Sequence, residues 1–337
     1  MSKPERQEEA AAAAAEVDAK KRDTLVRLAS TAMVGGAAGL GAWWFYDGDK
    51  PVRTRPKKVH TIPDHRVKAA PTTPPMVIAR GKDPAVNVKA ALIKMGGMAQ
   101  FISKGDVVLV KPNIGWDRRA AQAANTNPLV VGAVVKACVE AGAKRVIVTD
   151  HPVNDPARCF TRSGIKDATL AAGGKVEIPG DRRFHMVNIP GKLGRWPVFE
   201  PFITATKIIN VPIAKHHSLT TATLGMKNWY GILGGRRNQL HQRIDDSVAE
   251  LAALMRPTLT VMDATRLLMR NGPTGGSLAD VKQEDAIALS LDPVAADAWG
   301  AKLLGADPQK LAWLGLGQKK KLGVVDFESL NPVKLTT

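Results

Sequence analysis

Charged and polar side chains follow four apolar, β-branched stretches of the chain, each at the point where the stretch ends. These stretches are 106–111, 144–150, 204–213 and 258–263. Amines bind anions, whereas imidazoles and carboxylates bind metals or transfer protons. The residues that we expect to serve as ligands or acid–base groups are His151, His216, His217, Lys215, Asp150 and Asp263.

A glycine-rich stretch, Gly225–Arg237, combines aromatic residues with three cations. Glycine-rich backbone lets N–H groups approach an anion, and Lys or Arg side chains neutralise it. The alternative is a tight loop that packs Trp229 and Tyr230 into the core. Neither a phosphate-binding Walker motif nor a dinucleotide fingerprint occurs. The anion-binding candidates are Lys111, Asn113, Lys227, Asn228, Arg236 and Arg237.

Histidines and carboxylates near the same stretches predict a divalent-metal site as a second interpretation. Neighbouring side chains on an extended strand point in opposite directions, so at most one of His216 and His217 faces a ligand. His241 and Asp245 lie four apart and would share one face of a helix, although a surface His beside a capping carboxylate also explains them. The metal-ligand candidates are His151, His216, His217, His241 and Asp245.

The elements that must position these residues alternate between strands and helices. Asn127 and Pro128 form a helix start, since Asn caps and Pro suits the first helical position. Strand, helix and strand within 106–150 predict a βαβ unit with parallel strands, and such sheets bind ligands beyond the carboxyl ends of their strands. We therefore predict an α/β fold with a mostly parallel sheet flanked by helices, and a small subdomain inserted at 152–201. The expected strands are 76–80, 106–111, 144–150, 204–213 and 258–263, and the expected helices are 84–95, 128–141, 245–255 and 294–304.

The N-terminal quarter differs in composition from the rest. Residues 28–46 carry no charge, follow a basic cluster and end in four aromatic residues, which is typical of an export signal or a membrane anchor. Residues 21–26 resemble a twin-arginine signal with Lys in place of the first Arg. The alternative is a buried Ala/Gly-rich helix of a cytosolic protein. The expected organisation is an acidic Ala-rich tail (1–19), a signal or anchor (20–46), a basic Pro-rich linker (47–75), an α/β domain (76–330) and a short tail (331–337).

The composition narrows the classes of partner. The net charge is +17, and residues 51–75 hold six Lys/Arg against one acid, a net +5 beside the apolar stretch. Such charge favours anionic lipid head groups. Only 5% of residues are aromatic and no nucleic-acid reader motif occurs, so we expect no nucleic-acid partner. The expected partners are a membrane, a small anionic ligand and a membrane or redox partner protein.

The chain from about Met76 to Glu328 resembles a bacterial and archaeal family, the domain of unknown function 362, in several sequence motifs. They are VVLVKPNIG (107–115), NTNP (125–128), AGAKRVIVTDHP (141–152), LGMKNWYGILGG (224–235), MDATRLLMRNGPTGG (262–276) and DPVAADAWGAKLLGADP (292–308). The resemblance implies an exported or inner-membrane-anchored protein on the periplasmic face, of unassigned activity. Some relatives carry a ferredoxin-like iron–sulfur module. This chain has only Cys138 and Cys159 and no C-x-x-C, so we expect no cluster of its own.

Two functional hypotheses remain open on the sequence. In the first, an exported or tethered enzyme carries out a metal-assisted or redox reaction on a small anion, which Lys111, Lys215 and Lys227 hold. Histidines would then ligate a metal or exchange protons, oriented by Asp150 or Asp263. In the second, a non-enzymatic membrane factor uses the same residues for docking or cofactor delivery.

Overall fold

The computed structural model describes residues 18, 21–26 and 59–337. The chain divides into two units, Met1–Lys57 and Lys58–Thr337, and the expected apolar segment 28–46 lies outside the described residues. None of the helices in the described ranges is long and apolar enough to cross a membrane.

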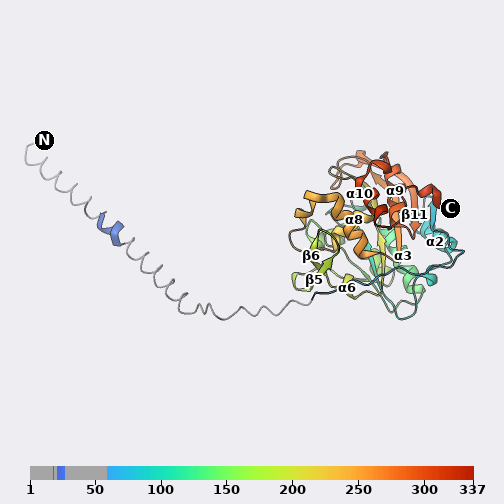
Figure 1. Ribbon diagram of the computed structural model, residues 1–337, viewed down its shortest axis with the longest axis horizontal. Helices are drawn as coiled ribbons and strands as arrows, with labels where there is room; N and C mark the ends of the chain where they lie inside the picture. The colour runs from blue at the N-terminus through green and yellow to red at the C-terminus, as the bar shows by residue number, and fades with distance from the viewer. Residues whose placement is uncertain (1–17, 19–20, 27–58) are drawn as a thin grey trace, which may run out of the picture. The chain divides into compact units, whose positions relative to one another are not determined.

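The second unit is built on a mixed, mostly parallel sheet of ten described strands, which confirms the predicted fold class (Figure 1). Its main path runs β12-β1-β11-β10-β7-β2-β3-β4, with β8 beside β10 and β9 beside β8. The pairs of β11 with β1 and β10, and of β8 with β9, are antiparallel, whereas the other pairs are parallel. The strands are β1 (Met76–Arg80), β2 (Val107–Pro112), β3 (Arg145–Val148), β4 (Lys175–Val176), β7 (Lys207–Val211), β8 (Ile213–His217), β9 (Thr221–Thr223), β10 (Leu259–Leu268), β11 (Val281–Ser290) and β12 (Val333–Thr336).

Helices cover both faces of this sheet, as β2 illustrates. Leu109 joins the core that includes side chains of α8, α9 and α10, whereas Val108 and Val110 join the core of α2 and α3. A strand buried on both faces is a continuous apolar run rather than an alternating one, which is why 106–111 was recognisable. The helices are α2 (Pro84–Lys94), α3 (Pro128–Glu140), α4 (Pro156–Arg162), α5 (Ile165–Ala171), α6 (Pro201–Thr204), α7 (Gly225–Asn228), α8 (Ile244–Met255), α9 (Pro293–Leu303) and α10 (Ala312–Lys319).

Local sequence accounts for the helix starts. The side chain of Asn127 accepts a hydrogen bond from the Leu129 backbone N–H, and Pro128 occupies the first turn of α3, as predicted. Asp83 caps α2 and Asp292 caps α9 in the same way. The βαβ unit of β2, α3 and β3 is therefore confirmed, with Val108 paired to Val146 in parallel register.

The structure corrects two strand predictions. The expected strand 204–213 is interrupted at Pro212, which lacks a backbone donor, and becomes β7 and β8. The expected end at Asp263 is wrong, because β10 continues to Leu268. Its antiparallel partner β11 was not predicted, since the first half of that strand is polar and partly exposed.

The segment expected as an inserted subdomain contributes α4, α5, β4 and a separate hairpin, β5 (Phe184–Ile189) and β6 (Gly194–Phe199). The hairpin residues Val187, Ile189 and Val198 are buried in the same core as α8. The segment belongs to the unit Lys58–Thr337. The segment therefore shares the core of the domain.

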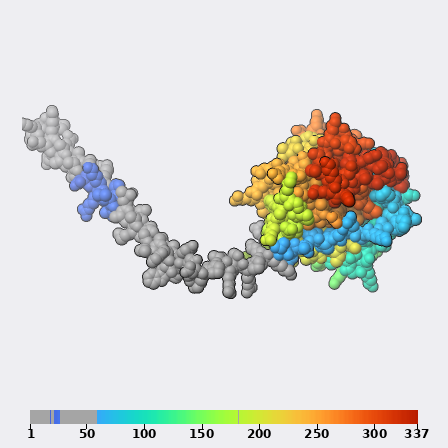
Figure 2. All heavy atoms as spheres, in the orientation of Figure 1, coloured from blue at the N-terminus to red at the C-terminus, as the bar shows by residue number. Residues whose placement is uncertain are grey.

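The described part of the expected linker also packs on the domain. His65 is buried, and its backbone carbonyl accepts a hydrogen bond of 2.6 Å from Thr258 Oγ1. The His60 N–H donates to the carbonyl of Met186 at 2.8 Å. In Figure 2 the blue segment that follows residue 59 runs along the surface below the red C-terminal segments. The described part of the expected linker is therefore tied to the domain through His60 and His65.

Candidate functional site

A cavity of about 390 Å³ lies beyond the carboxyl ends of β2, β3 and β8. Parallel sheets bind ligands at this edge, so the position agrees with the expected one. Its lining contains candidates from four separate regions of the chain, which are 113, 150–151, 215–217 and 227–241. The predicted residues that line it are Asn113, Asp150, His151, Lys215, His217, Lys227, Asn228, Arg237 and His241. The further lining residues are Gly115, Trp116, Val153, Ser218, Leu219, Thr223, Tyr230, Gly231, Pro273 and Thr274.

A buried ion pair lies beside the cavity, and its carboxylate partner Asp150 is one of the lining residues. Lys111 Nζ lies 2.7 Å from Asp150 Oδ1, and both side chains are almost fully shielded from solvent. The carboxylate also accepts hydrogen bonds from the backbone N–H groups of Ile114 at 2.6 Å and His151 at 2.9 Å. Burial lowers the pKa of Lys111, while Asp150 opposes that shift by favouring the ammonium. The charge of Lys111 is thus already matched within the protein.

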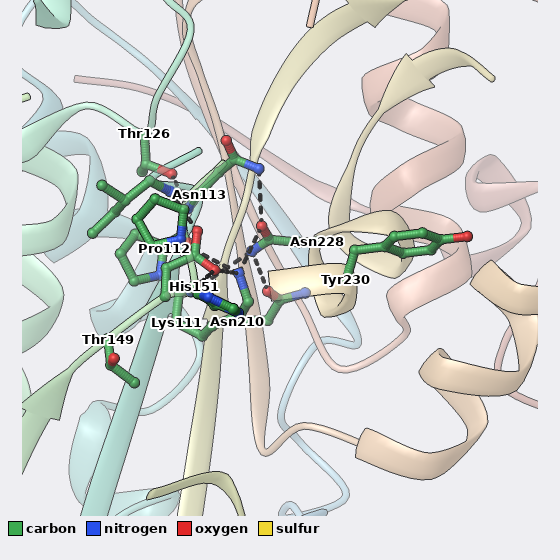
Figure 3. Close-up of polar contacts among 12 residues, drawn as sticks. Lys111, Pro112, Asn113, Thr126, Thr149, His151, Asn210, Asn228 and Tyr230 are labelled. Carbon is green, nitrogen blue, oxygen red and sulfur yellow. Dashed lines mark hydrogen bonds and ion pairs between the residues drawn. The ribbon is translucent and has the colours of Figure 1, made fainter. Parts of the chain in front are cut away.

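Asn228, at the end of α7, connects this pair to the neighbouring strands. Its Oδ1 accepts hydrogen bonds from Lys111 Nζ at 3.0 Å and from Asn113 Nδ2 at 3.1 Å. Its Nδ2 donates to the Lys111 carbonyl at 3.2 Å and to Asn210 Oδ1 at 2.9 Å. Figure 3 shows the Asn228 amide between those of Asn113 and Asn210, with dashed lines to both. This network fixes α7 over the ends of β2 and β7.

Lys215 is the second buried amine of the site. Its ammonium donates to Asn113 Oδ1 at 3.1 Å, to the Ala124 carbonyl at 2.5 Å and to the Pro273 carbonyl at 3.2 Å. Burial, followed by repulsion from Lys227, lowers the pKa of Lys215 to about 7. An ammonium has three donors, and these acceptors use all of them. Lys215 therefore joins two loops rather than presenting a free donor.

Lys227 is the third amine and differs from the other two. It is only 7% exposed, lines the cavity and lies with Nζ 4.8 Å from the centroid of the Tyr230 ring. No oxygen among the described residues accepts a hydrogen bond from this ammonium or pairs with it as an ion. Burial lowers the pKa of Lys227 to about 8, so the side chain is mostly charged at neutral pH. Within the described part of the chain, the cation–π contact with Tyr230 stabilises this ammonium.

His217 supplies a neutral donor beside Lys227. Its Nδ1 accepts a hydrogen bond of 3.1 Å from the Leu219 backbone N–H, so Nε2 carries the ring proton. Burial and the nearby ammonium groups of Lys227 and Lys215 lower the pKa of His217 to about 3. Thr223, on the adjacent strand β9, is buried and its Oγ1 has no hydrogen-bond partner within the described structure.

Arg237 closes one side of the cavity through backbone contacts. Its guanidinium donates to the carbonyls of His151 at 2.6 Å, Pro152 at 2.5 Å and Tyr230 at 3.4 Å. The imidazole of His151 is held in turn by a 2.6 Å hydrogen bond between Nδ1 and the Leu233 carbonyl. Burial lowers the pKa of Arg237. This side chain therefore positions the 151–152 loop against the stretch 230–233.

Asp297 positions α7 from beneath and was not predicted from the sequence. Its two carboxylate oxygens accept hydrogen bonds from Gly225 N at 2.6 Å and Met226 N at 2.8 Å. Burial raises the pKa of Asp297 to about 8. The residue lies about seventy positions along the chain from the helix that it caps, so no local spacing signals the contact.

Five candidates do not line the cavity: Lys111, which pairs with the lining residue Asp150, and Asp263, His216, Arg236 and Asp245. Asp263 is buried within β10 and accepts hydrogen bonds from Asn127 N at 2.7 Å and from Thr265. His216 does not line the cavity, and its Nδ1 accepts a 3.2 Å hydrogen bond from Gly272 N. Arg236 is exposed and Asp245 lies in the first turn of α8, and neither lines this cavity.

The metal-ligand candidates do not come together in one group among the described residues. His241 belongs to the 3₁₀ segment Arg237–Arg243, whereas Asp245 belongs to α8, so the expected single helix face does not form. The described residues contain no group of three or more His, Cys, Asp or Glu side chains that could hold a metal ion. Of the adjacent histidines only His217 lines the cavity, which agrees with the alternation expected for a strand.

The sequence model of the domain of unknown function 362 (DUF362) matches residues 108–302, more than half of the chain. The chain belongs to the DUF362 family. The matched region runs from β2 to α9 and so contains every residue of the Lys111, Lys215, Lys227 and Asp297 interactions described above.

This DUF362 chain is also similar to one protein in sequence and to one solved structure in fold. The thylakoid-associated protein sll1697 of Synechocystis sp. is 26% identical over 264 residues, which cover 73% of this chain and 78% of that protein. The lactate racemase apoprotein from Thermoanaerobacterium thermosaccharolyticum is 13% identical with a TM-score of 0.40. The match covers 72% of this chain and 58% of that structure.

Proposed function

We propose that this DUF362 protein binds a small anion in the cavity, with Lys227 as its counter-cation. The observation that carries the proposal is the state of the Lys227 ammonium, which is 7% exposed and has no acceptor among the described residues. A buried charge without a partner is costly. An anion at this position would neutralise the charge and accept its hydrogen bonds.

The neighbouring groups support the same assignment. Lys111 is paired with Asp150, Lys215 has three acceptors, and Arg237 donates to three carbonyls. Their charges keep the cavity electropositive while their donors are largely committed. His217 Nε2–H and Thr223 Oγ1 are two further polar groups without a partner in the described part of the chain. An oxyanion would interact with Lys227, His217 and Thr223.

Membrane association is the second part of the proposal. It is supported by the name of a relative, the thylakoid-associated protein sll1697, and by the basic 51–75 segment beside an uncharged stretch. Fractionation of cells that express the full chain would test it. We expect the chain in the membrane fraction after washing at high salt. Recovery in the soluble fraction would contradict membrane association and leave the anion site untouched.

Calorimetric titration of the full chain with butanoate at pH 7 tests the anion site. Lys227→Met keeps the length and apolar stem of the side chain and removes its charge. A hydrogen-bonded charge contact contributes about 1.5–3 kcal/mol, so we expect affinity to fall by about tenfold to hundredfold. The matched control is Lys144→Met, because Lys144 is exposed and lies away from the cavity lining. Equal affinity in wild type and Lys227→Met would overturn the proposal.

A further inference from the structure

We infer that the ligand is a small, water-soluble monoanion with an apolar body, whose anionic group lies at Lys227 and whose body contacts Trp116, Val153 and Leu219 at the cavity mouth. The inference rests on the proposed anion site and adds the chemical class of the ligand. Three features of the cavity carry it: the distribution of exposure along its walls, the number of uncommitted charges and its volume.

Exposure divides the lining into a polar floor and an apolar mouth. Lys227 is 7% exposed and His217 6%, whereas Val153 is 62% and Leu219 65% exposed. Trp116 lies between these extremes. Large exposed apolar side chains that line the same cavity as buried polar groups mark a binding surface. A ligand that reaches from floor to mouth therefore has a polar end and an apolar end.

The backbone links the apolar mouth to the polar floor. The Leu219 N–H is the donor that holds His217 Nδ1, so the turn that exposes the Leu219 side chain also fixes the ring proton of His217 on Nε2. On the opposite loop, Val153 N donates to the Gly115 carbonyl at 2.9 Å, next to Trp116. The mouth residues are thus held in place by defined contacts.

The charge inventory favours one negative charge on the ligand. Among the lysines of the site, Lys111 is matched by Asp150 and Lys215 by three acceptors, which leaves Lys227 uncommitted. A carboxylate, which carries one negative charge at pH 7, fits this single free ammonium better than a dianion.

The volume favours a free small molecule. A cavity of about 390 Å³ lies in the range that encloses a whole small ligand. A chain-length series of carboxylates tests this class: acetate, butanoate, hexanoate and octanoate, titrated into the full chain at pH 7. Burial of one methylene improves affinity by up to about fourfold. We expect affinity to rise with each added methylene until the cavity is filled.

Leu219→Ser is the variant that tests the mouth. We expect it to weaken octanoate binding about tenfold and to leave acetate binding unchanged, because acetate reaches only the floor. Leu170→Ser is the matched control, since Leu170 is 52% exposed on α5 and does not line the cavity. It should leave the whole series unchanged.

The outcomes separate this inference from the proposed function. If no carboxylate binds, the anion site itself is wrong. If acetate binds and the affinity does not change from acetate to octanoate, the anion site is supported. The inference that the ligand has an apolar body is then contradicted. Tighter binding of sulfate than of butanoate would contradict the inference that the ligand carries one negative charge. The wild-type chain could instead bind phosphatidylglycerol vesicles and lose that binding in both Leu219→Ser and Lys227→Met. This result would contradict a free small molecule and would indicate a lipid head group as the ligand.

Discussion

Lys111 Nζ and Asp150 Oδ1 form a 2.7 Å ion pair beside the cavity, where the parallel strands β2 and β3 end. The pair matches one cation and one anion inside the protein, and Asn228 ties it to α7 through a 3.0 Å hydrogen bond with Lys111. Among the described lysines that line the cavity, Lys227, one residue before Asn228, is the one without an ion pair or a hydrogen-bond acceptor. The internal pairing therefore makes Lys227 the residue available to a ligand.

Removal of one partner of the Lys111–Asp150 pair should destabilise the fold. Lys111→Met leaves the Asp150 carboxylate buried without a counter-charge, and the expected loss is about 3–5 kcal/mol of unfolding free energy. Urea denaturation of the full chain measures it. Lys136 and Glu140 provide the control, because this pair is exposed and 3.9 Å apart, and Lys136→Met should change stability by about 1 kcal/mol or less. Similar losses for the two variants would contradict the assigned role.

Gly231 is required by the close approach of its backbone to this pair. A Cβ added at Gly231 would overlap Asp150 Oδ1 and lie 2.8 Å from Lys111 Nζ. Gly231→Ala should therefore displace the carboxylate, lower the unfolding free energy by about 1–3 kcal/mol and weaken butanoate binding. Gly180→Ala is the control, since no atom lies within 4 Å of a Cβ there. A Gly231→Ala variant with wild-type stability and affinity would show that the pair tolerates the shift.

Asp297 predicts a defined pH dependence of stability. Its folded-state pKa is about 8, above the ordinary value of 3.8. The folded state therefore binds more protons than the unfolded state between these values, and the contribution of Asp297 to stability falls as the pH rises from about 4 to 8. Asp297→Asn cannot titrate. As the pH rises from about 4 to 8, the unfolding free energy of wild type should fall steadily relative to that of Asp297→Asn. A difference that stays constant over this range would contradict the raised pKa.

The sequence allowed much of the site to be predicted because strand ends are local features. Lys111, Asp150 and Lys215 follow or end apolar runs, and a parallel sheet brings such ends to one edge. The alternation of His216 and His217 was also predictable. Which of the two faces the cavity was not, because that depends on Gly272 N, which donates to His216 from a loop over fifty residues away.

Other features depended on tertiary packing. Asp263 was expected at a strand end, but β10 continues because the unpredicted β11 pairs with it as far as Leu268. The contact of Asp297 with α7 joins residues 71 and 72 positions apart. The apolar mouth at Val153 and Leu219 left no local signal, since single apolar residues in loops are common.

The charge of Lys227 predicts how anion affinity depends on pH. The lysine pKa of about 8 means that the ammonium is lost above that value, so butanoate affinity should fall by about tenfold per pH unit above pH 8. Titrations between pH 6 and 10 measure the profile. Arginine stays protonated over this range, so Lys227→Arg should bind butanoate with a much flatter profile. A wild-type affinity that is constant up to pH 10 would contradict Lys227 as the counter-cation.

The most direct test of the central claim is the pKa of Lys227 itself, measured by ¹⁵N NMR of the lysine Nζ atoms with and without saturating butanoate. An anion that binds the ammonium must raise its pKa, because binding and protonation are linked. We predict a rise of at least one unit above the ligand-free value of about 8. The Lys227→Met spectrum assigns the signal. An unchanged pKa at saturation would contradict the proposal that the anion lies at Lys227.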